Sequence, residues 1–405
     1  MEFIYPEKDK NIYDFNRGSK SIVVIKKTDN YIEEFYVYSV KFHKAANLLL
    51  DYLLNKSRKN ANIAQLDTYI FPLVFLYRHS LELLLKHIGL KLTNNDKEKK
   101  DYLKNKGHDL EKLLIYIGEK DIEWNKKDEY KWLLGFLSDF SSYDDKSDSF
   151  RYPFHIYTEN TSRGKKFNIK AIFEEQTDID LRKLSDKFKV SYKILKKYNC
   201  NEILEEKNYL KLKPIFIEGG NDYYGKAVIY GGSYKCEFYP YLDSYSKVAN
   251  EIKEFINENL IKGRYTERDI LFLPMCYLYR NAVELSFKRI IFEQSGKDNQ
   301  EGCKILNKKK HKIKGLWKAI YPYVKMCLNE DNIEDMSIVE EYIEQINNLD
   351  SDASKFRYPI NKDLQLYFSK DIIFDYKIVG DFMEALINFL DGIDAQLDLM
   401  KNYDY

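Results

Sequence analysis

Three sequence motifs occur twice in the chain, in the same order and about 203 residues apart. The pairs are Tyr77–Lys86 with Tyr279–Lys288, Phe150–Pro153 with Phe356–Pro359, and Glu34–Tyr36 with Glu237–Tyr239. A repeated unit of this length is long enough to bury its own core. We therefore predict two domains, residues 1–200 and 201–405, with a break near Gly219-Gly220. We expect the two copies to dock as an intramolecular pseudo-dimer.

The charges of the chain are almost balanced, with 65 Lys and Arg against 64 Asp and Glu. This balance argues against a dominant basic field, but a local patch that binds nucleic acid is compatible with it. We expect no membrane span, because no apolar run reaches the ~20 residues that a span needs. The five cysteines show no spacing typical of a metal or redox site. We therefore expect a cytoplasmic protein with no metal and no cofactor.

The apolar pattern predicts a mainly α fold with the same element order in both copies. Each copy is expected to begin with a short β pair, Ser21–Lys26 with Glu34–Tyr38 and Lys226–Tyr230 with Tyr234–Tyr239. The predicted central helices are Leu66–Leu90 and Glu267–Glu293, and each is followed by a polar loop, Thr93–Lys106 or Gln294–Lys310. Later helices are predicted at Glu129–Phe140, Ser337–Asn347, Asp180–Tyr198 and Val379–Lys401. The result is a helical bundle with a small β extension in each copy.

Arginine is scarce in this chain, with 11 Arg against 54 Lys. Four of the arginines, Arg78, Arg280, Arg151 and Arg357, nevertheless occupy matched positions of the repeat. The planar, five-donor guanidinium is hard to replace by Lys in a bidentate or buried contact. The four matched arginines are therefore candidates for a functional site.

The central helix places an Arg and a Glu four residues apart, which puts both on one helical face. The pairs are Arg78 with Glu82 and Arg280 with Glu284, and Lys86 and Lys288 extend the same stripe. One interpretation is an internal ion pair that orients each bundle. The other is a phosphate-binding Arg that the Glu holds in position.

A histidine precedes the next predicted helix in both copies, His108 in the first and His311 in the second. Either ring could simply bond a nearby backbone group. In the functional interpretation, one His acts as general base on a ribose 2′-hydroxyl and the other as general acid on the leaving oxygen. Lysines lie near both histidines, most densely at Lys308–Lys310, which is compatible with a solvated face or an RNA-backbone surface.

Arg151 and Arg357 each lie in a Phe-Arg-Tyr-Pro motif. The proline restricts the preceding Tyr to extended geometry, so the motif predicts a fixed corner. The structural interpretation buries each Arg against Asp144 or Asp350. The functional interpretation is a second phosphate clamp near the first.

The order of these motifs resembles the HEPN superfamily, in particular a branch found in bacterial defence loci. The resemblance covers about residues 43–154 and 246–360. It implies a four- or five-helix bundle that pairs across a helical face, and in many members a metal-independent ribonuclease. There an Arg, a polar residue, four to six residues and a His form the site. Arg78-His79 and Arg280-Asn281 match the start of that pattern, but the closing His is missing.

The resemblance implies an RNA-targeting effector of anti-phage defence, with Arg78, Arg280, His108 and His311 as catalytic residues and Glu82 and Glu284 positioning them. Phosphate contacts are expected from Arg151, Arg357, Lys86 and Lys288. The alternative is a catalytically inactive sensor or scaffold that binds RNA, a nucleotide or a partner subunit. An inert structural subunit and a homo-oligomer are also compatible with the sequence.

Overall fold

The computed structural model is mainly helical, as the apolar pattern predicts, with thirteen α-helices and three two-stranded sheets among the residues that it describes. Those residues are 4–60, 63–162, 164–205, 207–220, 223–229, 237–328 and 333–403. None of the helices in this part of the chain combines the length and the apolar character that a bilayer crossing requires. Below, residues 1–200 are called the first half and 201–405 the second half.

Seven helices belong to the first half. They are α1 (Tyr31–Asn60), α2 (Ala64–Lys91), α3 (Asp96–Lys106), α4 (Leu110–Lys120), α5 (Ile122–Asn125), α6 (Asp128–Asp144) and α7 (Leu181–Asn199). The second half contains α8 (Tyr239–Ile261), α9 (Thr266–Arg289), α10 (Asn299–Lys309), α11 (Ile313–Cys327), α12 (Ile333–Leu349) and α13 (Tyr376–Tyr403). Short helical turns are η1 (Asn208–Lys211), η2 (Tyr223–Gly225) and the π-type η4 (Ile290–Gln294).

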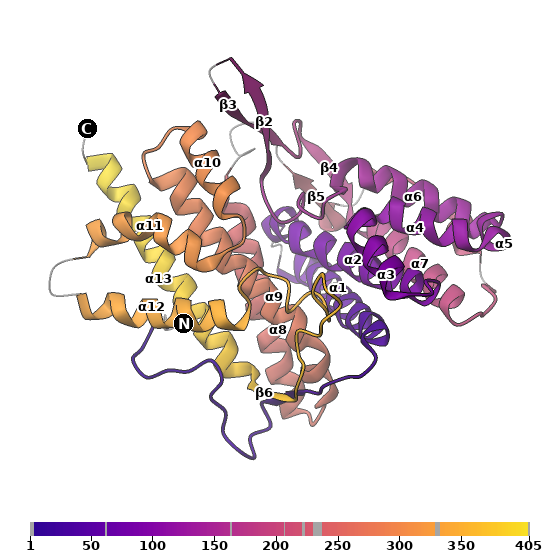
Figure 1. Cartoon of the computed structure of the whole chain (residues 1–405), viewed down its shortest axis with the longest axis horizontal. Coiled ribbons are helices and arrows are strands. Elements are labelled where there is room, and N and C mark those ends of the chain that lie inside the picture. Colours follow the sequence, from indigo (N-terminus) through magenta and orange to yellow (C-terminus); the bar gives the residue numbers. More distant parts are fainter. Residues whose placement is uncertain are drawn as a thin grey trace.

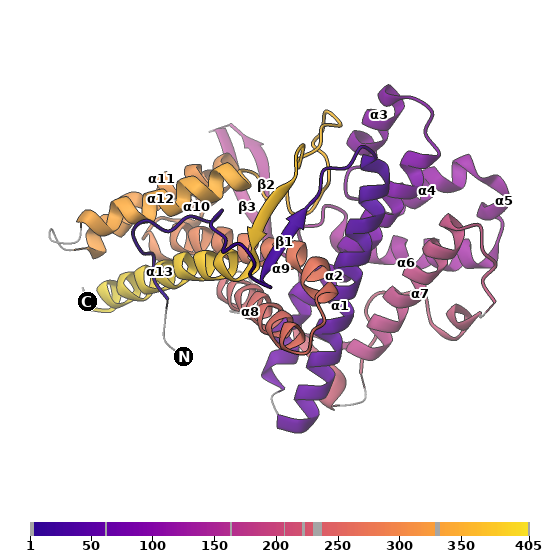
Figure 2. The ribbon, with the colours of Figure 1, turned by 90° about the horizontal axis from the view of Figure 1, so that it is seen from below.

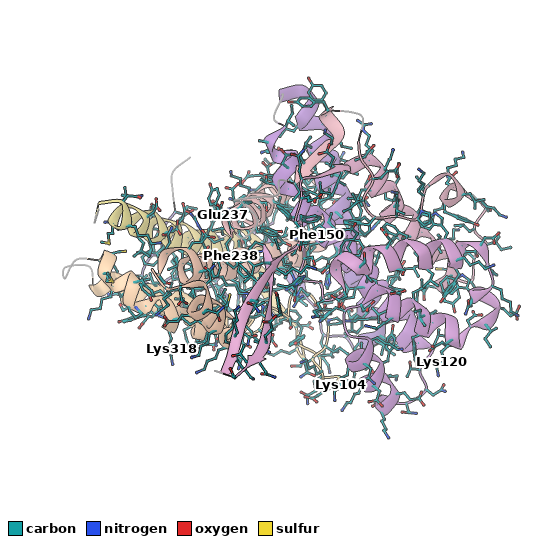
Figure 3. The ribbon with its side chains drawn as sticks, turned by 90° about the horizontal axis from the view of Figure 1, so that it is seen from above. Lys104, Lys120, Phe150, Glu237, Phe238 and Lys318 are labelled. Carbon is teal, nitrogen blue, oxygen red and sulfur yellow. The ribbon has the colours of Figure 1, made fainter. Side chains whose placement is uncertain are left out.

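The helices α1, α2, α8 and α9 form the centre of the molecule (Figure 1). Helix α2 packs against α8 and helix α1 packs against α9, so the two halves share one continuous core. Helices α3 to α7 lie on one side of this centre and α10 to α13 on the other (Figure 1). Figure 3 shows Phe150 near the middle and Lys120 and Lys318 toward opposite ends. Residues that follow the first half, in η1 and β5 (Lys226–Ile229), pack on α2, α6 and α7.

Helices α2 and α9 are buried on all sides. Every residue from Tyr69 to Leu90 and from Leu271 to Lys288 is buried. A helix of this kind is expected to be apolar all round, yet both carry the charged residues of the repeated motif. Those charges must find partners inside the protein, because an unpaired buried charge is very unfavourable.

The first predicted β pair is wrong in its partner. Strand β1 (Ile22–Ile25) pairs with β6 (Ile372–Asp375) from the end of the chain, antiparallel, and not with Glu34–Tyr38, which lies in α1 (Figure 2). Strand β5 pairs with β4 (Thr177–Asp180). Residues 234–236 of the predicted partner strand Tyr234–Tyr239 lie outside the described residues, as do residues 230–233 before them, and Tyr239 begins α8. A strand that pairs with a distant segment leaves no signal in the sequence around it, and a prediction based on neighbouring segments therefore assigns it the wrong partner.

The lysine-rich segments predicted as loops contain helices α3 and α10. Asn95 and Asp298 cap these helices, since their side-chain oxygens accept from the backbone N–H groups of Glu98 and Glu301 at 3.0 and 2.8 Å. The polar composition hid short amphipathic helices with good caps. The remaining sheet is a hairpin of β2 (Phe154–Thr161) and β3 (Gly164–Ala171), which projects from the centre and contacts α10 (Figure 1).

Candidate functional site

Arg78 and Glu82 form the predicted ion pair one turn apart on α2, and both side chains are fully buried. The Arg78 Nε also lies 3.2 Å from a carboxylate oxygen of Asp144. A terminal nitrogen of Arg78 donates to the backbone carbonyl of His108. The guanidinium thus holds α2, the end of α6 and the turn before α4 together, and it has no exposed surface to offer to a ligand.

The Glu82 carboxylate collects several donors besides Arg78. One oxygen accepts from Lys86 Nζ at 2.6 Å, from His108 Nδ1 at 2.9 Å and from the Tyr358 hydroxyl at 2.7 Å. Burial alone would raise the pKa of Glu82, but Lys86, His108 and Arg78 hold it well below its usual value. Glu82 is therefore a carboxylate at neutral pH.

The second half repeats this arrangement around Glu284. Its carboxylate accepts from Arg280 at 3.3 Å, from Lys288 at 2.8 Å, from His311 Nδ1 at 2.8 Å and from the Tyr152 hydroxyl at 2.7 Å. Arg280 also donates to the backbone carbonyl of His311 at 2.9 Å. Burial alone would raise the pKa of Glu284, but Lys288, His311 and Arg280 hold it well below its usual value. The two sites therefore have the same set of partners.

Each site receives its tyrosine from the other half of the chain. Tyr358 of the second half bonds to Glu82, and Tyr152 of the first half bonds to Glu284. Both tyrosines come from the Phe-Arg-Tyr-Pro motif and are buried. The sequence did not predict that each tyrosine would bond to the other half, although Tyr152 and Tyr358 directly follow the candidate arginines Arg151 and Arg357.

An aspartate fixes the turn before each of these tyrosines. Asp144 Oδ1 accepts the backbone N–H groups of Asp148 and Ser149 at 2.8 and 3.1 Å, and Asp350 Oδ1 accepts those of Ser354 and Lys355 at 3.0 and 3.1 Å. Ser147 and Ala353 occupy left-handed backbone with φ of 64° and 60°. The expected fixed corner is therefore present in both halves, built by the aspartate as well as by the proline.

Arg151 is buried, as the structural interpretation predicts, but its ion-pair partner is neither Asp144 nor Asp350. Arg151 pairs with Asp148 at 2.5 Å, because Arg78 already occupies Asp144. Arg357 is also buried and donates from Nε to the Ala353 carbonyl at 2.7 Å. Its Nη1 has no hydrogen-bond partner within the described part of the chain.

His108 and His311 are the exposed members of the two networks, with 42% and 34% of their side chains accessible. Burial lowers the pKa of His108 below its usual value, although Glu82 opposes this. The Glu284 carboxylate favours a charged His311, but burial, Lys288 and Arg151 outweigh it and lower the pKa of His311. A neutral ring that donates Nδ1–H to a carboxylate keeps a lone pair on Nε2. Each ring is therefore oriented as a general base.

A pocket of about 320 Å³ opens beside His311. His155, Lys146, Lys288 and Lys310 line it together with the Tyr152 ring, and Asp148 adds a carboxylate. Phe238 forms part of the wall and lies next to the base of the hairpin (Figure 3). The pocket thus gathers two imidazoles and three ammonium groups. His155 and Lys146 were not predicted, but His155 is one of only six histidines and lies two residues after the second motif.

The described residues contain no group of three or more His, Cys, Asp or Glu side chains placed to hold a metal ion. Comparison of the chain with protein-family models, with curated proteins and with solved structures finds no significant match.

Proposed function

We propose that this chain is an RNA-targeting endoribonuclease whose chemistry takes place in the pocket beside His311. One observation carries the proposal: His311, oriented by the buried Glu284, opens on a pocket that also holds His155 and three lysines. A carboxylate–histidine pair beside a second imidazole supplies the two proton transfers that RNA cleavage requires. The ammonium groups of the lysines stabilise the negative charge of a bound phosphodiester.

In the proposed reaction, Nε2 of His311 takes the proton of a ribose 2′-hydroxyl. The 2′-oxygen then forms a bond to phosphorus, and the bond from phosphorus to the 5′-oxygen breaks. His155, in its protonated form, gives a proton to that leaving oxygen. The products are a 2′,3′-cyclic phosphate and a 5′-hydroxyl. Glu284 holds His311 in the required tautomer and stabilises the imidazolium that forms.

The arginines have a different role in this proposal from the one that the sequence predicted. Arg280 has no exposed surface and bonds to Glu284 and to the His311 backbone. It is a positioning residue, which fixes the carboxylate and the turn that carries the histidine. Arg78 does the same for Glu82 and His108 in the first half.

We also propose that the fold is a tandem pair of HEPN-like bundles docked as a pseudo-dimer. The support is the repeated set of contacts around Glu82 and Glu284 and the reciprocal placement of Tyr358 and Tyr152. A role in anti-phage defence follows only from the resemblance of the motifs to that superfamily, and a cytoplasmic location only from the number and spacing of the cysteines.

A second candidate is a catalytically inactive module that binds RNA, a nucleotide or a partner subunit. The observation that favours it is the complete burial of Arg78 and Arg280. In the resembling ribonucleases an arginine takes part in the site, whereas here both guanidiniums are used inside the protein. In this second candidate, the pocket beside His311 binds a ligand but its histidines transfer no protons.

The test is cleavage of labelled RNA by the purified protein in the presence of EDTA. We expect His311→Ala and His155→Ala to lose about 10²–10⁴-fold in rate, the usual contribution of a general acid or base. His108→Ala is the matched control, because it removes the same hydrogen bond from the equivalent network of the first half. It should keep the wild-type rate.

Cleavage that persists in His311→Ala and His155→Ala would refute the catalytic assignment, and binding without cleavage in the wild type would favour the second candidate. Equal losses in His108→Ala and His311→Ala, with unchanged thermal unfolding, would instead support the sequence prediction that both histidines are catalytic.

A further inference from the structure

Lys310, the residue before His311, has a backbone conformation that suits glycine. Its φ and ψ are 51° and −113°. The Lys312 N–H bonds to the Lys309 carbonyl at 3.1 Å and closes a four-residue turn with Lys310 in its second position. These angles are close to those of a type II′ turn, in which glycine dominates at that position because a Cβ is strained there.

The matched residue of the first half is glycine. Gly107 precedes His108 with φ and ψ of 58° and −115°, and Asp109 N–H closes the same turn on the Lys106 carbonyl at 3.2 Å. A Cβ built on Gly107 would meet no atom within 4 Å, so a larger side chain at this position would be disfavoured by the backbone conformation and not by a steric clash with neighbouring residues. The same backbone is therefore unstrained in the first half and strained in the second.

The strained side chain lines the pocket beside His311. Lys310 and Lys146 both contribute to its walls, and both are exposed. Neither ammonium has an ion-pair or hydrogen-bond partner in the described part of the chain, whereas the third lysine, Lys288, pairs with Glu284. Asp148, the carboxylate in the pocket, is taken by Arg151. Two exposed cations without an ion-pair partner in the described part of the chain thus line this pocket.

We propose that this pocket binds a phosphate ester through Lys310 and Lys146, and that the strain at Lys310 persists because its ammonium contacts the ligand. Backbone strain is typically retained where it serves function. The inference deepens the proposed function, on which it rests for the identity of the anion, a phosphodiester of RNA. It also makes the two histidine sites unequal, since Gly107 gives the first half no such cation.

The test compares thermal stability with anion binding in the same variants. The probes are inorganic phosphate and a short 2′-deoxy oligonucleotide, which lacks the attacking hydroxyl and cannot be cleaved. We expect Lys310→Gly to raise Tm by about 1–4 °C, because the strain is removed. The same variant should bind both probes about fivefold to tenfold more weakly, because a charged donor is lost.

Two controls separate charge from strain. Lys310→Arg keeps the cation and a Cβ, so it should bind both probes like the wild type and show no gain in Tm. Lys308→Ala removes one nearby charge outside the pocket and should leave binding unchanged. A Lys310→Gly protein with unaltered affinity, or with no rise in Tm, would overturn the inference.

Failure of this inference is distinguishable from failure of the proposed function. If Lys310→Gly weakens binding but His311→Ala still cleaves RNA, the anion site stands and the catalytic assignment falls. If His311→Ala abolishes cleavage while Lys310→Gly binds normally, the reverse holds.

Discussion

Replacing Glu284 by Gln should be among the most destabilising single substitutions in the chain. The change conserves shape and removes one negative charge. Glu284 accepts hydrogen bonds from Arg280, Lys288, His311 and Tyr152, and its side chain is completely buried. Gln has one acceptor oxygen and adds two N–H groups, so it leaves two cations without an anion. Removing one partner of a buried ion pair costs about 3–5 kcal/mol.

The free energy of unfolding can be measured by urea denaturation at pH 7, with helical circular dichroism as the signal. Glu82→Gln should cost a similar amount, because Glu82 has the same partners. Glu123→Gln is the control: Glu123 is 82% exposed and pairs with Lys126 on the surface. Exposed pairs contribute only about 0–1 kcal/mol. A loss below about 1 kcal/mol in Glu284→Gln, indistinguishable from that control, would show that the network is not the stabilising unit described above.

Two more predictions follow from the networks. Tyr152→Phe should raise the pKa of His311, because the Glu284 carboxylate loses a competing donor, and should leave His108 unchanged. Tyr358→Phe should do the reverse. NMR titration of the imidazole rings measures both pKa values. A change in the pKa of His108 in Tyr152→Phe, or of His311 in Tyr358→Phe, would contradict this prediction. Burial lowers the pKa of His79 to about 4. The unfolded chain therefore takes up that proton first, and stability should fall by up to about 1.4 kcal/mol per pH unit as pH drops from about 6.5 toward 4. Urea titrations at several pH values should show this slope, reduced in His79→Gln.

The local features of the site could be predicted from the sequence. The pairing of Arg78 with Glu82 follows from a spacing of four residues on a helix, and the apolar run around them identifies a buried helix. The positions of α6 and α7 also agree with the predicted helices. Each of these depends on residues within a few turns of one another, where helical geometry fixes the distance.

The features that depend on distant segments could not be predicted. The hydroxyl of Tyr358 reaches Glu82 across 276 residues, and β1 pairs with β6 from the other end of the chain. No periodicity in the sequence encodes such a pairing. His155 was missed for a related reason, since it joins His311 only through the way β2 lies against the second half.

The exchange of tyrosines has a consequence for the order of events during synthesis. Ribosomes add about 5–20 residues per second. The 276 residues between Glu82 and Tyr358 therefore take roughly 14–55 s to make. During this interval the site around Glu82 lacks its tyrosine, whereas the site around Glu284 has all its partners once His311 has been made, 47 residues before Tyr358. The site around Glu82 and His108 therefore cannot be complete before Tyr358 has been made, and a product that ends before Tyr358 would lack a complete first site.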